Sequence, residues 1–318
     1  VELNDFGSIV NDLKLSRSFG DVDVNLGYYV ADQNISMSWL WNSYLMALKG
    51  DNAELLNVTA ADGTAFSEQG LLAYGVPYWG NCCQRNYDTS YSIKAPYAGV
   101  SWTYGDLSLD ASIRRDIGSA SGTYAGAVQS SRDMNSDGVI SQVEQSVSAI
   151  DLANASIVNY SWGYNSYSAG ANYQFNKDWA MFGRISQGGR ANADRLLFGK
   201  VNADGSVAKE DAVDEVTQYE LGSKSRHGNL NLFATLFFAE TEEQNFEATS
   251  QRFFDRTYKA HGIELESSYR IGDFDMRGSV TWTDAEISKD ALTPEVVGNT
   301  PRRQADFVYN LLARYFFE

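Results

Sequence analysis

The sequence is poor in proline and cysteine and lacks long apolar runs. It contains 4 prolines and 2 cysteines in 318 residues. No stretch of about 18 consecutive apolar residues occurs, which excludes a transmembrane helix. The cysteines, Cys82 and Cys83, are adjacent. They are too few for a disulfide scaffold and wrongly spaced for a zinc site.

Basic residues are also scarce: the chain has 25 Lys and Arg against 41 Asp and Glu, which gives a net charge of -16. Such a balance disfavours nucleic acid as a partner. The two histidines, His227 and His261, have no Ser or Cys partner in a catalytic pattern, so we expect no enzyme activity. The chain starts at Val1 without a leader sequence, so we expect a removed signal peptide or an internal piece of a longer chain.

Glycine and aromatic residues are abundant, with 27 Gly, 19 Tyr, 16 Phe and 7 Trp. Apolar and polar residues alternate through 273–283, where Val280 and Trp282 share one face and Thr281 lies on the other. A period of two predicts strands with one apolar and one wet face. We predict about twelve strands, near 8–18, 21–32, 70–76, 91–104, 106–118, 157–175, 178–191, 214–226, 229–242, 253–271, 273–286 and 303–317.

Short and long connections alternate along the chain. The tight turns are Gly20-Asp21, Gly105-Asp106, Asn176-Lys177, His227-Gly228 and Gly272-Asp273. The long polar connections are 33–94, 119–156, 193–213, 243–252 and 287–301. This alternation predicts an all-β, antiparallel transmembrane barrel with short periplasmic turns and long extracellular loops.

Large aromatic residues flank the tight turns on the apolar face, as an aromatic girdle at a membrane interface would. The alternative is that aromatic residues are simply common in strands. The girdle would comprise Phe19, Tyr104, Phe175, Trp179, Tyr269 and Phe274.

The segment "NISMSWLWNSYLMALKG" departs from the alternation. Asn34 is a suitable helix cap and Lys49-Gly50 a suitable end, which predicts a short extracellular helix. An irregular pair of hydrophobic strands is the alternative reading.

The segment "DMNSDGVISQVE" has the spacing of an EF-hand calcium loop. Oxygen ligands would come from side chains and from the Val139 carbonyl, with Gly138 at the sharp turn. A solvated Asp-Gly turn is the alternative. We expect a structural Ca²⁺ site in extracellular loop 119–156, followed by a short helix in 141–153. The ligands would be Asp133, Asn135, Asp137, Val139, Ser141 and Glu144.

The segment "YGVPYWGNCCQRNY" holds both cysteines. Outside the cytoplasm they would be oxidised, either to a strained vicinal disulfide or with other partners, and free thiols remain an alternative. Nearby residues form a candidate ligand platform, with ordinary loop packing as the alternative: Tyr78, Trp79, Arg85 and Tyr87.

Polar residues on the wet face would line the lumen, either as a plain hydrated wall or as contacts for a plug or a passing solute. They are Asp23, Asn25, Asp110, Arg114, Glu220, Lys224, Glu264, Glu266, Asp275 and Arg277.

The segment "GNTPRRQADFVYNLLARYFF", Gly298–Phe317, resembles a barrel segment of TonB-dependent outer-membrane receptors. "DVDVNLGYYVADQNISMSWLWNSYL" resembles a strand of the same barrels entering a large extracellular loop. The resemblance implies a plugged barrel of about 22 strands that imports iron–siderophore complexes, cobalamin or oligosaccharides.

The chain departs from that family pattern because we recognise about twelve strands and neither a plug nor a TonB box. We therefore expect residues 1–318 to form one partial outer-membrane barrel, with the EF-hand-like loop 133–144 as an insertion. Energy coupling to TonB would depend on a plug outside these residues. The alternatives are a passive porin and an outer-membrane or secreted β-structured hydrolase.

Overall fold

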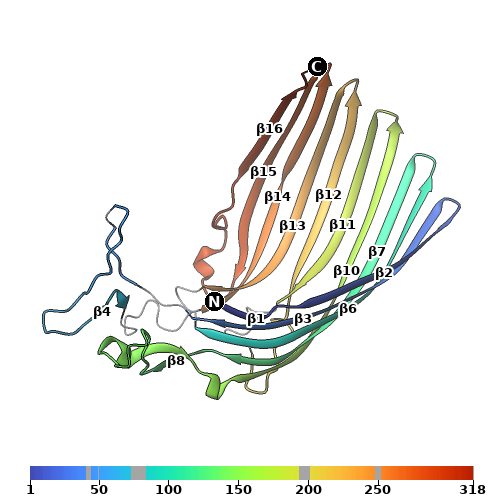
Figure 1. Ribbon diagram of the computed structural model, residues 1–318. Helices are drawn as coiled ribbons and strands as arrows, with labels where there is room; N and C mark the ends of the chain where they lie inside the picture. The colour runs from blue at the N-terminus through green and yellow to red at the C-terminus, as the bar shows by residue number, and fades with distance from the viewer. Residues whose placement is uncertain (41–43, 49, 73–83, 193–200, 248–251, 318) are drawn as a thin grey trace.

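The computed structural model describes residues 1–40, 44–48, 50–72, 84–192, 201–247 and 252–317. The chain forms one large antiparallel sheet that curves into an open half-barrel (Figure 1). Among the described residues, no helix is long and apolar enough to span a membrane.

The large sheet has twelve strands, of which eleven were predicted; the twelfth is β1, and the predicted strand 70–76 is not part of this sheet. β1 and β2 lie end to end on the same edge of β3, so they share one position in the sheet. The strands are β1 (Glu2–Asp5), β2 (Ser8–Phe19), β3 (Val22–Trp39), β6 (Arg85–Tyr104), β7 (Leu107–Ala125), β10 (Ser156–Asn176), β11 (Trp179–Ala191), β12 (Val213–His227), β13 (Leu230–Glu247), β14 (Arg252–Ile271), β15 (Phe274–Asp290) and β16 (Phe307–Tyr315).

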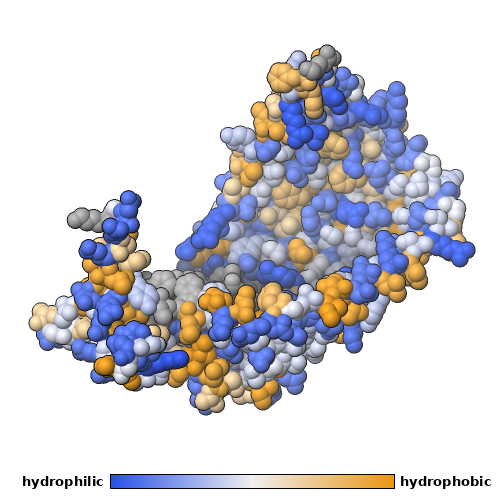
Figure 2. All heavy atoms as spheres, viewed as in Figure 1, coloured by the Kyte–Doolittle hydropathy of each residue, from blue (hydrophilic) through white to orange (hydrophobic). Residues whose placement is uncertain are grey.

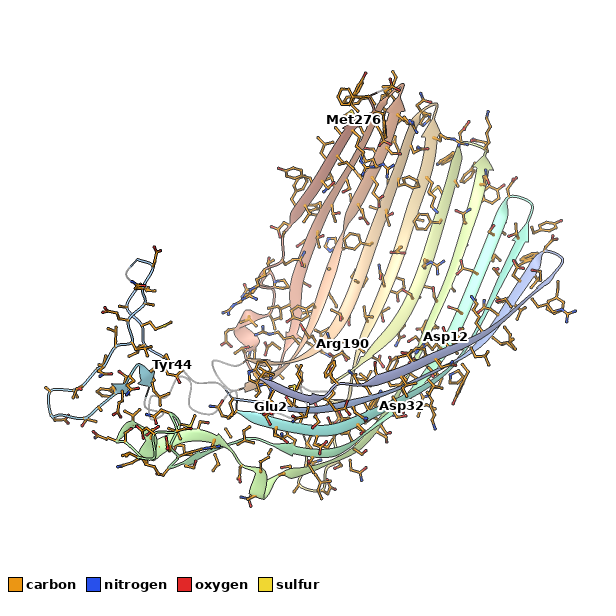
Figure 3. All side chains as sticks on the ribbon, viewed as in Figure 1. Glu2, Asp12, Asp32, Tyr44, Arg190 and Met276 are labelled. Carbon is orange, nitrogen blue, oxygen red and sulfur yellow. The ribbon has the colours of Figure 1, made fainter. Side chains whose placement is uncertain are left out.

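The register separates two faces, since directly opposed residues point to the same side of a sheet. One row joins Asp110 to Gly170, Arg184 and Glu220 across four strands. Extended along and across the strands, this face contains all ten polar residues predicted to line the lumen. It is the concave face, where Figure 3 shows Asp12, whereas Asp32 lies on the convex side. Figure 2 shows the hollow, with hydrophilic residues over much of it.

The convex face carries many exposed apolar residues, among them Ile113 and Trp102, the latter opposite Leu109. All six predicted girdle aromatics belong to this face and flank the tight turns. Phe175 and Trp179 stack with ring centroids 4.1 Å apart. The face assignment from the sequence is therefore confirmed.

All five tight turns lie at one end of the sheet, because every pair of neighbouring strands is antiparallel and the tight turns alternate with the long connections along the chain (Figure 1). They are two-residue turns, and four begin with a glycine of positive φ, which the hairpin twist favours. Two turns lie one residue later than predicted, at Lys177-Asp178 and Gly228-Asn229. The long connections and the EF-hand-like loop lie at the opposite end.

Three local predictions were wrong. Asn34 does not cap a helix but lies inside β3, and Tyr44 and Met46 form β-bridges. The predicted strand 70–76 contributes Leu71–Leu72 (β5), which pairs with Ser67–Glu68 (β4) outside the large sheet; 73–76 lie outside the described residues. The segment 141–153, where a helix was expected, contains a 3-10 turn, η1 (Val143–Ser146), then β9 (Val147–Ile150) and the start of a second 3-10 turn, η2 (Leu152–Asn154).

The half-barrel is open at both edges. β2 and β16 occupy the edges, and no strand among the described residues pairs with their outer sides. The sheet has an odd number of positions, because β1 and β2 share one of the twelve. The two edge strands therefore run in the same direction and cannot pair antiparallel with each other.

Candidate functional site

The middle of the concave wall is a tier of paired polar side chains. Arg184 donates to both Asp110 oxygens, at 2.9 and 3.0 Å. Arg114 donates hydrogen bonds to Asp116 from Nε and Nη2. Tyr97 donates to Asp12 over 2.9 Å. A depression of 490 Å³ lies against this tier. Matched charges of this kind suit a hydrated wall that a solute passes.

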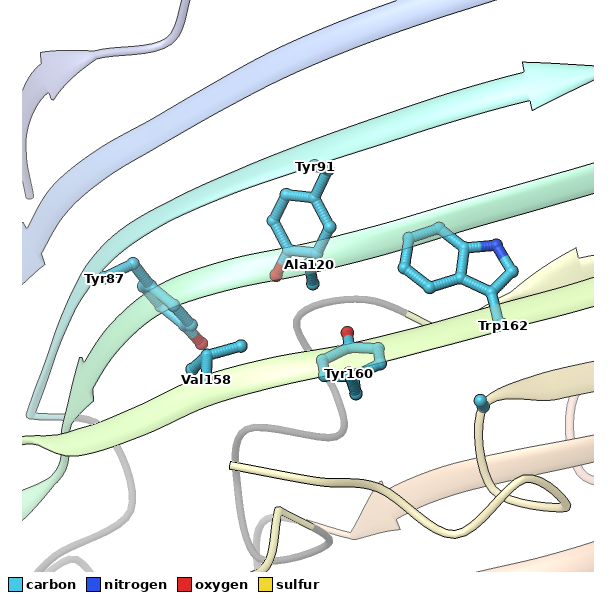
Figure 4. Close-up of a cluster of buried hydrophobic side chains, with 7 residues drawn as sticks. Tyr87, Tyr91, Ala120, Val158, Tyr160 and Trp162 are labelled. Atoms are coloured by element: carbon cyan, nitrogen blue, oxygen red, sulfur yellow. The ribbon is translucent and has the colours of Figure 1, made fainter. Parts of the chain in front are cut away.

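The outer part of the same wall is aromatic. Tyr87 and Tyr91 on β6, Ala120 on β7, and Tyr160 and Trp162 on β10 form a buried cluster whose side chains point to one side (Figure 4). The register explains the convergence, because Tyr91, Ala120 and Tyr160 occupy one row. The segment between β11 and β12 covers the cluster with further side chains: Val201, Val207 and Ala212.

Two residues of the predicted ligand platform belong to this wall. Arg85 is 8% exposed and its guanidinium lies 3.7 Å from the Trp39 ring centroid. Tyr87 is 2% exposed and packs against Tyr124. The other four residues of that segment with a predicted role lie outside the described residues: Tyr78, Trp79, Cys82 and Cys83.

Sequence reasoning missed most of the aromatic wall. Tyr91, Tyr160 and Trp162 follow the period of two, but they lie on the concave face. Closer to the tight turns, the residues of this face are polar. The available signal was the pattern Tyr-x-Thr-x-Tyr at 87–91 and Tyr-x-Trp-x-Tyr at 160–164. Residues 87–91 lie in the predicted connection 33–94 and residues 160–164 in the predicted strand 157–175. Aromatic residues spaced by two on the otherwise polar face indicate that these strands continue beyond the membrane.

Two buried polar atoms of the wall have no hydrogen-bond partner among the described residues: Thr89 Oγ1 and Trp162 Nε1. Their residues are 3% and 6% exposed. The Trp162 ring lies across Gly118, where a Cβ would come within 2.3 Å of it. Buried polar groups normally have partners, so these atoms are available to a ligand or a water. The wall thus combines aromatic surface with free polar groups.

The EF-hand-like loop forms the tip of a small hairpin of β8 (Ala127–Ser130) and β9 (Val147–Ile150). Glu144, 1% exposed, turns its carboxylate inward and accepts backbone N–H groups of Met134, Asn135 and Ser141 at 2.7, 3.3 and 3.0 Å. Burial alone would raise the pKa of Glu144, but these hydrogen bonds outweigh it and lower that pKa.

The remaining expected ligands also face the backbone of the loop. Asp133 accepts from Gly138 at 2.8 Å, and Asp137 accepts from Val139 at 2.8 Å. Gly138 has a φ of 86°, as the sharp turn requires. Within the described part of the chain, no three acidic, His or Cys side chains gather closely enough to hold a metal. The oxygen donors have the chemistry that Ca²⁺ prefers, although their charges are turned to the backbone.

Comparison with known proteins shows what kind of barrel this wall belongs to. Residues 3–318 match the family model described as "TonB dependent receptor-like, beta-barrel". The chain belongs to this family. TonB-dependent receptors are outer-membrane transport receptors and not enzymes, so the predicted fold class and localisation are confirmed. A comparison with curated proteins gave no match.

Several solved receptors share the fold at low sequence identity. The ferric yersiniabactin uptake receptor FyuA from Yersinia pestis is 14% identical with a TM-score of 0.60, over 97% of this chain and 39% of that one. The siderophore receptor PiuA from Acinetobacter baumannii is 15% identical with a TM-score of 0.59, over 97% and 43%. The FrpB iron transporter from Neisseria meningitidis is 12% identical with a TM-score of 0.57, over 98% and 40%. The chain spans about two fifths of the length of these receptors.

Proposed function

We propose that this TonB-dependent receptor barrel imports a scarce solute across the outer membrane with energy coupled through TonB. The family match carries the proposal. The solved relatives are named for uptake of ferric yersiniabactin, siderophores and iron, which supports a chelated metal as one candidate cargo. Cobalamin and oligosaccharides are the other candidate classes.

The two tiers of the concave wall support this function. An incoming solute first meets the aromatic tier, where the partly buried rings of Tyr124 and Tyr164 border the buried cluster that holds Tyr160 and Trp162. It then passes the hydrated tier, where Arg184 and Asp110 are already paired. Aromatic stacking with a few polar contacts is the usual basis of small-ligand binding. TonB and the plug would supply the work of release.

Uptake into cells tests the proposal. Cells that carry the intact protein are given radiolabelled ferric chelates, cobalamin or oligosaccharides, with TonB present or deleted. We expect uptake of one class, lost without TonB, and reduced by Trp162→Ala. The matched control is Trp102→Ala on the convex face, which should leave uptake unchanged. TonB-independent uptake of unrelated solutes of similar size would indicate a passive porin instead.

We also propose that loop 133–144 binds one structural Ca²⁺. The sequence motif supplies the donors, and the buried Glu144 carboxylate already contacts both the start and the end of the loop, at Met134 and Ser141. Asp133, Asn135, Asp137, the Val139 carbonyl and Glu144 would hold the ion, with Ser141 contributing directly or through a water. The ion would neutralise the loop and fix its conformation, and the strands would keep their own hydrogen bonds.

Limited proteolysis of the intact protein with Ca²⁺ or a chelator tests this site. We expect calcium to slow cleavage within 124–150, and Mg²⁺ at the same concentration to protect less, since it prefers a smaller octahedral site. Cleavage of this loop at one rate in both conditions would show that the motif is an acidic turn.

A further inference from the structure

The convex face of β3, β6, β7 and β10 changes in steps towards the end with the long connections. An apolar row comes first, in which Leu26, Ala98, Ile113 and Tyr167 pair across the four strands. Lys94 and Arg115 follow on β6 and β7. Beyond them the outward positions are hydroxyl and amide side chains with one carboxylate: Asp32, Ser92, Ser119 and Ser161 in one row, then Asn34, Ser90, Ser121 and Asn159 in the next.

Lys94 and Arg115 are exposed, and neither forms an ion pair with any described residue. This is unusual in a chain of net charge -16. The Arg115 guanidinium is nevertheless held in place. It donates to Asn165 Oδ1 over 3.2 Å and lies above Gly163, where a Cβ would come within 2.9 Å of Nη2.

Some cations elsewhere on the convex face are paired, whereas Arg17 on β2 lies over the Phe19 ring near the tight turns and forms no ion pair with a described residue. Lys259 lies 3.5 Å from Glu240, and His261 lies 3.7 Å from Asp284. On the convex face of β3, β6, β7 and β10, Lys94 and Arg115 are the two cations, and neither has an ion pair among the described residues. These strands meet the outer leaflet of the membrane, because the long connections lie at the extracellular end of such barrels.

We propose that this surface binds the headgroup of a phosphorylated glycolipid of the outer leaflet. The apolar row would contact its acyl chains, and Lys94 and Arg115 would contact phosphate. Arginine offers phosphate a planar fork of donors, and lysine adds a mobile charge. The two rows of serine and asparagine would hydrogen-bond the sugar hydroxyls. The layers follow each other as apolar, basic and polar, in the same order as the acyl chains, phosphate and sugar of such a lipid. The proposed lipid site does not depend on which solute is imported.

Native mass spectrometry of the intact protein in detergent tests the site. The probes are a phosphorylated disaccharide glycolipid, its dephosphorylated form, and phosphatidylglycerol, which has a phosphate and no sugar. We expect the phosphorylated glycolipid to bind best. The double variant Lys94→Gln/Arg115→Gln should bind it roughly 25-fold less tightly, since each basic side chain near an anionic surface contributes a factor of about five.

Lys259→Gln, which removes a paired cation from the same face, is the matched control and should bind like the parent. Both variants change exposed side chains, and retained resistance to heat in a gel-shift assay would confirm that they fold. Equal binding of the phosphorylated and dephosphorylated glycolipids would overturn the proposal. So would unchanged binding by the double variant, or phosphatidylglycerol binding as tightly as the glycolipid.

Discussion

Arg85 lies directly opposite Trp39 across β3 and β6, with its guanidinium carbon 3.7 Å from the indole centroid. Tyr87 supplies a second ring at 5.6 Å. A desolvated cation over an aromatic face stabilises a structure by about 0.5–2 kcal/mol. The contact fastens the outer ends of two neighbouring strands beneath the extracellular segments.

Replacing Arg85 by methionine should loosen this end of the wall and leave the rest of the barrel unchanged. Arg85→Met keeps a long side chain but removes the cation, so amide hydrogen exchange should quicken in 35–39 and 85–91. Arg226→Met, an exposed change beside a tight turn, serves as the control. Unchanged exchange in both segments would mean that the stacked pair contributes nothing measurable.

Neighbouring residues of β15 should differ sharply in their tolerance of charge. Val280 lies on the convex face and Thr281 on the concave face, which we assign to lipid and lumen. Val280→Arg should cost about 2–4 kcal/mol of unfolding free energy near the midplane, whereas Thr281→Arg should cost little. Urea unfolding in lipid vesicles measures both. Equal costs would contradict the assignment of the faces.

The paired strands and their faces could be predicted because they depend on local alternation. Near the tight turns, water lies inside and lipid outside, so Thr281 and Val280 follow the expected pattern. Beyond the membrane the environment reverses, since the convex face meets water and the concave face lies under the extracellular segments. Ser90 is therefore exposed and Tyr91 buried. This reversal is set by tertiary structure, which explains why β6 begins at Arg85 and not near 91.

The helix expected from Asn34 failed for a related reason. Its apolar residues fit a helical pattern locally, but Ile35 and Met37 pack against the aromatic cluster from β3. Pairing with β6 along its whole length overrides the local preference. The EF-hand-like motif was visible from spacing alone, whereas the hairpin that carries it was not.

Acid should weaken the ion pair of Asp290 and Arg256. Burial alone would raise the pKa of Asp290, but hydrogen bonds from Arg256 and Thr293 lower it from 3.8 to about 2. Asp290 has a lower pKa in the folded state than in the unfolded state, so its ionised carboxylate stabilises the fold by about 2 kcal/mol. This stabilisation is present above pH 3.8 and is lost as the pH falls through 2. Unfolding free energies of the parent and Asp290→Asn should differ at pH 7 and converge near pH 2. A constant difference would contradict this linkage.

Glu144→Gln should abolish the effect of calcium on loop 133–144, because a neutral amide cannot replace a bidentate carboxylate. The variant should be cleaved at the rate of the chelated parent, with or without Ca²⁺. Glu295→Gln, an exposed carboxylate in a different connection, should behave like the parent. Calcium protection that survives Glu144→Gln would exclude this residue as a ligand.

Accessibility labelling in whole cells tests the central claim most directly, namely that this wall spans the outer membrane with its long connections outside. Cys82 and Cys83 are first replaced by serine in the intact protein. Single cysteines are then placed at exposed positions of the two ends, Ala291→Cys and Asn229→Cys. A membrane-impermeant maleimide should label position 291 in intact cells, and position 229 after the outer membrane is opened. Labelling of position 229 in intact cells, with position 291 protected, would contradict the account.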